Sequence, residues 1–336
     1  MISKYPPKEP LVSIVIPTWN GQKWLKDCFT SIKKQSYSQI EVILVDNNSS
    51  DNTEKWVKDH FKWVKVVKSK SNLGYGNANN LGANIAKGSL LFFLNNDTKL
   101  LPNAISKLVK YKALKSLNIV GPRILNPEGK ETYGGKYIGI DPLSVHGWSK
   151  KTFYIDGCAL LVSKKDFFEL GGFDPAYFTY NEDIDLCWRA WLYGMSVGLL
   201  DDALLYHFSG GTSIKTTKTV GIQHTTSFFR RYEVEKNNLR NLLKNYHLFN
   251  LIWVVPLYLI QQISEAVLHL VTGNAKMAGV LVQAIIWNLN NFNSTLTLRK
   301  KIQTYRKIPD SFILKLMTFR INKLYTFTKI GLPKFT

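Results

Sequence analysis

The chain has 336 residues and a formal net charge of +20, so it can bury a full core as one large domain or two smaller ones. A basic excess of this size points to an anionic partner, which can be nucleic acid, lipid or an anionic substrate. The three cysteines lack metal-ligand spacing, which argues against a disulfide framework and favours a reducing compartment. The first residues contain no apolar core, and we expect no secretory signal.

Short apolar runs alternate with segments of helical periodicity in the first third of the chain. The runs predict four buried strands, at 11–16, 41–45, 63–67 and 89–94. The segments between them predict helices over 21–34 and 51–60, and a third helix that follows a loop at 72–80 and runs to Lys87. Strands that alternate with helices indicate an α/β fold with a mainly parallel, doubly wound sheet.

Beyond Pro102 the alternation loosens. We predict helices over 104–115 and 183–194, and strands over 153–162, 196–200 and 203–206. Residues 126–148 are rich in glycine and turn formers, so this region is expected to be irregular and to face a substrate. The composition changes near His224, which predicts one domain over 1–224 and a helical, basic region over 225–336.

Two strongly apolar stretches lie in that C-terminal region, at 248–260 and 277–298. The first contains Pro256 and the second contains four asparagines, so neither is a clean run of about 20 apolar residues, the length that spans a bilayer. Flanking Lys and Arg with interleaved Trp and Tyr favour helices that lie at an anionic membrane surface. The alternative is a helical subdomain packed on the main sheet.

The most informative stretch is Tyr180-Asn181-Glu182-Asp183-Ile184-Asp185-Leu186-Cys187-Trp188-Arg189, with three carboxylates in four positions. So many acids after an aromatic run are costly unless each has a partner or a chemical role. Asp185 and Arg189 are four apart on the predicted helix, which fits a structural ion pair. Upstream, Asp97 ends an apolar run, where open α/β sheets bind ligands. Together these acids suggest an enzyme with a metal-held anionic substrate and a separate general base.

Seven motifs occur in order between Leu11 and Lys244. They are Ile16-Pro17-Thr18-Trp19-Asn20, Val45-Asp46-Asn47-Asn48-Ser49-Ser50-Asp51, Asn72-Leu73-Gly74-Tyr75-Gly76-Asn77-Ala78-Asn79-Asn80, Leu94-Asn95-Asn96-Asp97-Thr98, Gly171-Gly172-Phe173-Asp174, Glu182-Asp183-Ile184-Asp185 and His207-Phe208-Ser209-Gly210-Gly211-Thr212-Ser213. Their joint order and spacing resemble the family 2 glycosyltransferases, which are inverting enzymes with the GT-A fold. The third and fourth motifs look most like the rhamnosyltransferase-type branch, which also includes galactofuranosyl transferases.

The resemblance implies a donor site for a nucleotide-diphosphate sugar, either dTDP-rhamnose or a UDP-sugar, with the nucleotide-binding half at 11–100 and the acceptor half at 101–224. Asp46 is an acceptor-only carboxylate that would take a hydrogen bond from the imide N–H of uracil or thymine. By itself, Asp46 is equally well explained as a helix cap or turn acid. The other expected nucleotide-binding residues are Pro17, Thr18, Asn20, Asn72, Gly74, Asn77 and Asn96.

The resemblance also implies the catalytic residues. Asp97 and His207 are the expected ligands of Mg²⁺ or Mn²⁺, an ion that neutralises charge on the leaving diphosphate. Asn95 stands where the family often has the first acid of Asp-x-Asp, and a lone histidine such as His207 can instead be structural. Asp183 is the expected general base for the acceptor hydroxyl, and Glu182 would position the acceptor or tune that base.

These residues predict a transferase that moves a sugar, with rhamnose as the leading candidate, to a lipid-linked or cell-surface polysaccharide. We expect a peripheral enzyme at the cytoplasmic face of the cell membrane. The alternatives are another UDP, dTDP or GDP sugar such as galactofuranose, a sugar-1-phosphate nucleotidyltransferase, and a basic nucleic-acid-binding protein. Residues 21–23 are too short for a nucleotidyltransferase phosphate loop, and no nucleic-acid-binding signature accompanies the charge, so we expect no nucleic acid partner. Whether the chain forms a homodimer stays open.

Overall fold

A computed structural model describes residues 9–133, 137–141, 144–145, 152–208, 225–319, 321, 323–325, 328 and 334–335. The chain divides into two compact units, each built from three separate segments. Unit 1 comprises Met1–Thr132, Asp156–Phe173 and Gly198–Gly211. Unit 2 comprises Tyr133–Ile155, Asp174–Val197 and Thr212–Thr336. Glu182 and Asp183 therefore belong to the same unit as the C-terminal helices, and the domain boundary near residue 224 stays a prediction.

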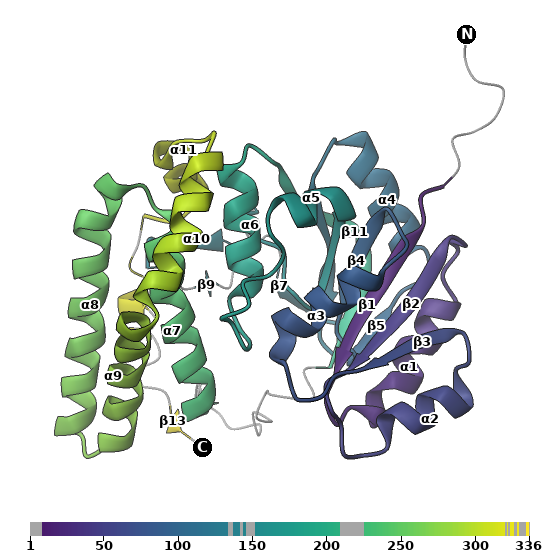
Figure 1. The fold of residues 1–336 in the computed structure, drawn as a ribbon, viewed down its shortest axis with the longest axis horizontal. Helices are drawn as coiled ribbons and strands as arrows, with labels where there is room; N and C mark the ends of the chain where they lie inside the picture. The colour runs from purple at the N-terminus through teal and green to yellow at the C-terminus, as the bar shows by residue number, and fades with distance from the viewer. Residues whose placement is uncertain are drawn as a thin grey trace, which may run out of the picture. The chain divides into compact units, whose positions relative to one another are not determined.

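Unit 1 is built around a mixed sheet in the order β3-β2-β1-β4-β10-β6-β11-β5, with β7 beside β6 (Figure 1). The strands are β1 (Val12–Thr18), β2 (Ile40–Asp46), β3 (Val64–Lys68), β4 (Leu90–Leu94), β5 (Thr98–Leu100), β6 (Ile119–Leu125), β7 (Glu131–Tyr133), β10 (Ala159–Ser163) and β11 (Val197–His207). Strands β1 to β4 are parallel, as the alternating pattern predicts. Strand β10 pairs antiparallel with β4 and β6, and β11 with β5, so the second half of the sheet departs from the parallel arrangement.

Helices cover both faces of this sheet, and the alternation of side chains along β1 decides which face each helix meets. Ile14 and Ile16 share a buried cluster with residues of α1 (Gln22–Lys33), α2 (Thr53–His60) and α4 (Ala104–Leu114). Val15 points to the other face, where it lies against Gly82 of α3 (Gly74–Ile85). Successive strand side chains point to opposite faces, and both faces of β1 and β4 are buried. The doubly wound α/β class is confirmed.

Four predicted boundaries differ from the structure. The strand predicted over 153–162 begins only at Ala159, as β10. Helix α3 begins at Gly74, so the loop predicted at 72–80 is mostly helical. The two short strands predicted between 196 and 206 are one strand, β11. The apolar stretch at 277–298 is broken at Asn291 into α9 (Ala275–Asn290) and α10 (Phe292–Tyr305).

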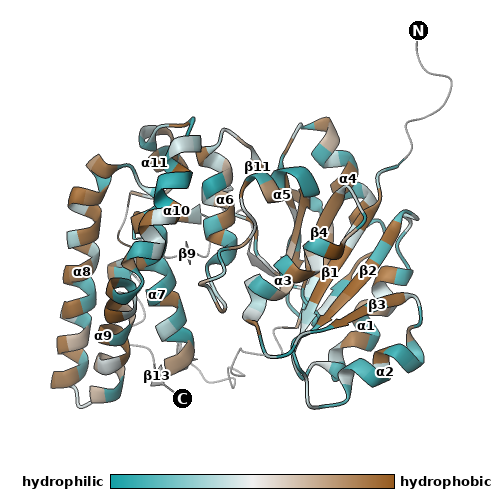
Figure 2. Cartoon of the chain, viewed as in Figure 1, coloured by the Kyte–Doolittle hydropathy of each residue, from teal (hydrophilic) through white to brown (hydrophobic). Residues whose placement is uncertain are grey.

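Unit 2 contains a bundle of helices, as predicted for the C-terminal region. Its helices are α6 (Glu182–Leu192), α7 (Phe228–Asn245), α8 (Leu248–Val271), α9, α10 and α11 (Asp310–Leu316), with the short strand pairs β8 (Tyr137–Ile138) with β9 (Ser144–Val145) and β12 (Thr225–Thr226) with β13 (Lys334–Phe335). Helix α7 packs against α6, α8, α9 and α10. Among the described residues, α8 alone is long and apolar enough to cross a membrane, and Figure 2 colours most of it hydrophobic. By itself, this length and composition is weak evidence for a membrane span.

Candidate active site

The carboxyl ends of β1 and β4 separate at the centre of the sheet in unit 1. Strand β1 pairs with β2 along its whole length, but its pairing with β4 stops at Val15 and Phe93. The strand order reverses here, because β2 and β3 lie on one side of β1 and β4 on the other. Open α/β sheets bind ligands at such a topological switch point. Pro17 and Thr18 occupy the part of β1 that β4 no longer pairs with.

Asp46 is the last residue of β2 and its side chain is fully buried. Its Oδ1 accepts a hydrogen bond from the backbone N–H of Ser49 at 2.9 Å. Its Oδ2 has no hydrogen-bond partner among the described residues. A buried carboxylate oxygen without a donor costs free energy, which a ligand N–H would recover. Because Asp46 is fully buried, a ligand reaches this oxygen only if neighbouring residues move.

The turn after β1 is joined to the ends of β2 and β4. The Nδ2 of Asn96, which follows β4, donates to the Oγ1 of Thr18 at 2.7 Å. The Oδ1 of Asn20 accepts from the backbone N–H of Ser50 at 2.8 Å. Gly21 packs so closely on Thr18 and Asn96 that a β-carbon would overlap both side chains. Thr18 and Asn96 therefore brace each other, and Asn20 joins the turn to the loop after β2.

Asn72 and Gly74 shape the entry into α3. The Oδ1 of Asn72 accepts from the backbone N–H of Gly74 at 3.0 Å, and Gly74 has a φ of 77°, which favours glycine. Asn47 ties this turn to the end of β2, since its Nδ2 donates to the carbonyl of Gly74 at 3.0 Å. The Nδ2 of Asn77 donates to the carbonyl of Leu73 at 3.3 Å. These contacts explain the local structure, and the nucleotide-binding roles of all three residues stay predictions.

Asp97 and His207 lie together although they are far apart in the sequence. Antiparallel pairing places His207 of β11 opposite Thr98 of β5. The His207 Nε2 then lies 3.3 Å from the Oδ1 of Asp97 and 3.4 Å from the Nδ2 of Asn95. The rest of the motif that begins at His207, residues 209–213, lies outside the described residues.

A carboxylate oxygen and an imidazole nitrogen are donors that fit a divalent ion such as Mn²⁺. Within the part of the chain that the structure describes, no group of three or more His, Cys, Asp or Glu converges. Asp97 and His207 are thus a two-residue set, and phosphate oxygens and water would complete the shell. Mg²⁺ sites often have this composition, with one or two carboxylates plus substrate phosphates. The residues present therefore fit an ion that arrives with a diphosphate.

In unit 2, Glu182 and Asp183 begin helix α6, directly after two residues with left-handed backbone, Tyr180 (φ 69°) and Asn181 (φ 64°). Such backbone is strained for residues other than glycine and persists only where the surroundings impose it. Helix α7 supplies that constraint. The Nδ2 of Asn237 donates to the carbonyls of Thr179 at 2.9 Å and Tyr180 at 2.7 Å. The predicted base therefore follows a segment held in place by α7.

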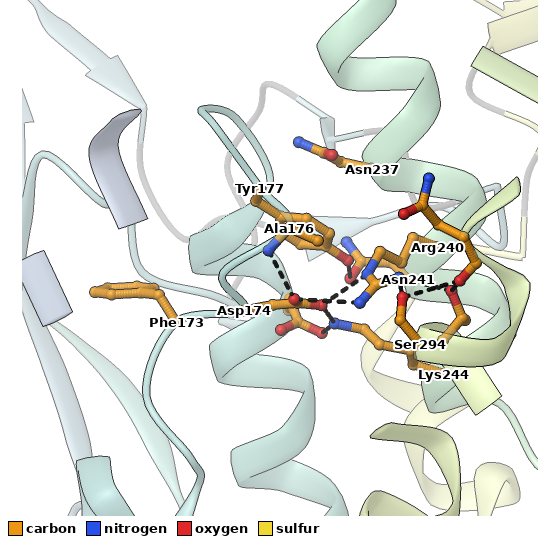
Figure 3. A network of polar contacts seen from close by, with 12 residues as sticks. Phe173, Asp174, Ala176, Tyr177, Asn237, Arg240, Asn241, Lys244 and Ser294 are labelled. Carbon is orange, nitrogen blue, oxygen red and sulfur yellow. Dashed lines mark hydrogen bonds and ion pairs between the residues drawn. The ribbon is translucent and has the colours of Figure 1, made fainter. Parts of the chain in front are cut away.

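Two buried carboxylates, those of Asp174 and Asp185, connect α7 to the chain before α6 and to α6 itself. Asp174 accepts from the Nε of Arg240 at 2.8 Å and from the Nζ of Lys244 at 2.5 Å, as Figure 3 shows. The Nζ of Lys244 also lies 2.9 Å from the Oδ1 of Asp185. The predicted ion pair of Asp185 with Arg189 is confirmed at 2.7 Å. All five side chains are buried.

These bases decide the charge state of both acids. Burial alone would raise the pKa of Asp174, but Lys244 and Arg240 outweigh it and hold the pKa well below its ordinary value. Burial likewise opposes ionisation of Asp185, and Arg189 with Lys244 lowers its pKa. The partners of Asp174 on α7 were missed from the sequence. The available signal was a basic residue at every fourth position of α7, namely Lys236, Arg240 and Lys244.

Asp97 and His207 lie in unit 1, whereas Glu182 and Asp183 lie in unit 2. Each pair is assembled within its own unit.

Comparison with known proteins bears on both the family and the fold. Residues 13–171 match the family described as "Glycosyl transferase family 2". The chain is 27% identical over 229 residues to the O-antigen biosynthesis protein RfbC of Myxococcus xanthus, covering 61% of this chain and 18% of that protein. It is 32% identical over 134 residues to a Campylobacter jejuni protein named GalNAc(5)-diNAcBac-PP-undecaprenol beta-1,3-glucosyltransferase, covering 38% of this chain and 43% of that protein. Each match thus covers less than half of the relative.

Solved structures show the same fold. A crystal structure of GalNAc-T7 with UDP, GalNAc and Mn²⁺ aligns with a TM-score of 0.58 and 18% identity, covering 73% of this chain and 50% of that one. Residues 1–349 of S. aureus TarS align with a TM-score of 0.51 and 17% identity, covering 70% and 66%. Residues 13–171 are thus similar to family 2 glycosyltransferases, and the solved structures support a GT-A fold for the chain. The rhamnosyltransferase-like branch stays a prediction.

Replacing Gly21 by alanine should destabilise the turn after β1. The added β-carbon would displace Asn96 or Thr18, and overpacking of this kind typically costs about 1–3 kcal/mol. The free energy of unfolding from urea titration measures the effect. Gly279→Ala in α9 is the matched control, since nothing lies within 4 Å of its added carbon, and alanine should leave that helix as stable or more stable. Equal stability of Gly21→Ala and the unchanged protein would contradict the close packing.

The acid stability of the chain should depend on Asp174. A carboxyl whose folded pKa is depressed contributes stability above its unfolded pKa, near 3.8, and this is lost as the pH falls through the folded value. The midpoint temperature of thermal unfolding should therefore decrease as the pH is lowered below about 4. Asp174→Asn should flatten this dependence and cost about 3–5 kcal/mol at neutral pH, since it leaves Lys244 and Arg240 undercompensated. Asp201→Asn, at an exposed position, should leave the profile unchanged; an Asp174→Asn profile parallel to that of the parent would refute the assignment.

Proposed function

We propose that the chain is an inverting glycosyltransferase that moves a sugar from a nucleotide-diphosphate donor to an acceptor hydroxyl. The observation that carries the proposal is the meeting of Asp97 and His207, whose side chains lie 3.3 Å apart just beyond the end of β4. Asp97 lies within residues 13–171, which match glycosyl transferase family 2. The unpartnered Asp46 oxygen at the neighbouring strand end supports it. A diphosphate near Asp97 and a base ring near Asp46 would extend across the switch point.

Asp97 and His207 would hold Mg²⁺ or Mn²⁺, and the bound ion would neutralise charge on the nucleoside diphosphate as it leaves. Asp183 would accept the proton of the acceptor hydroxyl while that oxygen bonds to the anomeric carbon. The bond from this carbon to the diphosphate oxygen breaks, and its electron pair leaves with the nucleoside diphosphate. Glu182 would position the acceptor. This reaction requires the two pairs of residues to share a cleft, which is part of the proposal.

The donor we favour is dTDP-rhamnose, followed by UDP-sugars, because of the motifs at 72–80 and 94–98. Uracil and thymine share the imide N–H that Asp46 would bind. For the acceptor we favour a lipid-linked or cell-surface polysaccharide at the cytoplasmic face of a membrane with anionic lipids. Two relatives support this choice, one named for O-antigen biosynthesis and one for a glucosyltransferase acting on an undecaprenol-linked glycan.

Asp183→Asn should lower turnover by about 10²–10⁴-fold, the usual contribution of a general base, and leave donor affinity within about twofold. Release of nucleoside diphosphate measures turnover, and calorimetry with the donor measures affinity. Asp202→Asn, at an exposed position of β11, is the control and should retain full activity. Undiminished turnover in Asp183→Asn would remove this residue from the mechanism.

A screen of nucleotide sugars by thermal shift, with Mn²⁺ present, should identify the donor, since a ligand that binds only the folded chain raises its apparent stability. Asp46→Asn should weaken binding of that donor by about tenfold, because it places an amide where the base N–H needs an acceptor. The folded chain should be no less stable, since the Asp46 oxygen that is lost has no partner. A donor that stabilises Asp46→Asn as strongly as the parent would exclude a role for Asp46 in base binding.

A further inference from the structure

Most of the buried side chains of helix α8 are polar, and nearly all of its exposed ones are apolar. The buried positions recur every three or four residues and are Asn250, Val254, Tyr258, Gln262, Ala266 and His269. The exposed positions form a second stripe, called here the outward face of α8. It consists of Leu248, Phe249, Ile252, Pro256, Ile260, Ile263, Ser264, Val267, Leu270 and Val271. In a helix bundle surrounded by water, the polarity of the two stripes would be reversed.

Specific polar contacts hold the helix in this orientation. The hydroxyl of Tyr258 donates to the Oε2 of Glu235 on α7 at 2.5 Å. The Nη2 of Arg231 on α7 donates to both carboxylate oxygens of Glu265 at 2.7 Å. Rotating α8 to bury its apolar stripe would leave these buried groups without partners, at a cost of several kcal/mol. The exposure of the outward face is therefore imposed by the polar surface of α7.

The outward face is too apolar to be stable against water. Val271, Phe249 and Ile252 are 80%, 75% and 70% exposed, and the stripe runs the length of a 24-residue helix. Helix α9, which packs beside α8, adds its own exposed apolar side chains, including Ile286 and Leu289. Soluble chains rarely expose contiguous apolar patches of more than a few hundred Å². A surface of this kind is expected to be covered by something other than water.

The chemistry of the surface favours lipid over a second protein. Protein interfaces concentrate their binding energy in Trp, Tyr and Arg, and the outward face has none of these. It is mostly aliphatic and continuous, as acyl chains require. The exposed Lys276 lies in the first turn of α9, next to the end of α8. The net charge of +20 suits the anionic lipid headgroups that would surround an inserted helix.

We propose that the outward face of α8 inserts into the acyl layer of one leaflet, with the helix axis along the membrane surface. A helix of 24 residues is about 36 Å long, enough to cross a bilayer, but α8 is apolar on one side only, the mark of an interfacial helix. Insertion of this kind is driven by burial of apolar surface. It therefore survives high salt and occurs on neutral lipid, unlike adsorption through basic charge. It does not depend on the proposed transfer reaction.

A fluorescent label on the outward face tests the insertion directly. Ile260→Cys, in the full chain, provides an exposed thiol, whereas Cys28, Cys158 and Cys187 are buried. Burial raises the pKa of Cys28 to about 12 and also raises the pKa of Cys187, which leaves both thiols unreactive. An environment-sensitive dye at position 260 should shift to the blue on phosphatidylcholine vesicles, with or without phosphatidylglycerol, at about 0.1 M and at about 0.5 M salt. The same dye on Leu114→Cys, on α4 of unit 1, should not shift.

A double variant tests the energetics. Ile260→Glu with Val267→Glu changes two exposed positions to a residue that favours helices, and should weaken vesicle binding at least tenfold in sedimentation assays. Lys300→Glu with Lys301→Glu, both exposed, should weaken binding only to anionic vesicles at low salt. No blue shift at position 260, or binding that high salt abolishes, would overturn the proposal. The proposal would also be overturned if the chain formed a dimer without lipid, and the variant Ile260→Glu with Val267→Glu dissociated that dimer without changing vesicle binding. A second copy of the chain would then cover the face. The labelled single variant decides the question even if the double variant fails to fold.

Discussion

The helical unit is organised around one ammonium group, the Nζ of Lys244, which lies between the carboxylates of Asp174 and Asp185. Neither acid would stay ionised in such a buried place without the bases beside it. Through them the start of the 174–181 segment, helix α6 and helix α7 are tied together. The proposed base Asp183 lies two residues before Asp185 on α6, close to these contacts. A reactive carboxylate needs such support, because small displacements are costly in rate.

The same helix, α7, explains the exposed apolar surface of α8. Eleven of the 18 residues of α7 are buried, and most of them are charged or amide side chains. One set bonds to the segment before α6 and another set, including Glu235 and Arg231, bonds to α8. A helix that is polar on several sides can be buried only among polar partners. Helix α8 therefore turns its few polar residues inward, and its apolar residues are left outside.

The parts that sequence predicts well are those set by local periodicity. The four parallel strands and their helices follow from alternating runs. The apolar run places Asp97 near the end of β4, although that strand ends at Leu94. The antiparallel half of the sheet was not predicted, because the pairing of β10 between β4 and β6 depends on residues far apart in the chain. The contacts of Asp174 with α7 join residues of equally distant segments. The basic excess was interpreted as a surface for anionic partners, yet Arg189, Arg240 and Lys244 use their charge inside the protein.

The two units of the chain carry different parts of the proposed active site. The candidate donor residues Asp46, Asp97 and His207 belong to the sheet unit, and the candidate base belongs to the helical unit. The outward face of α8 belongs to that helical unit as well. If α8 lies in a leaflet, the unit that contacts the lipid is the unit that carries the proton acceptor. An acceptor glycan anchored in the same leaflet would then have its hydroxyl confined near that surface, which reduces the entropy lost on meeting Asp183. A soluble donor carries no such anchor, and the candidate donor residues lie in the other unit.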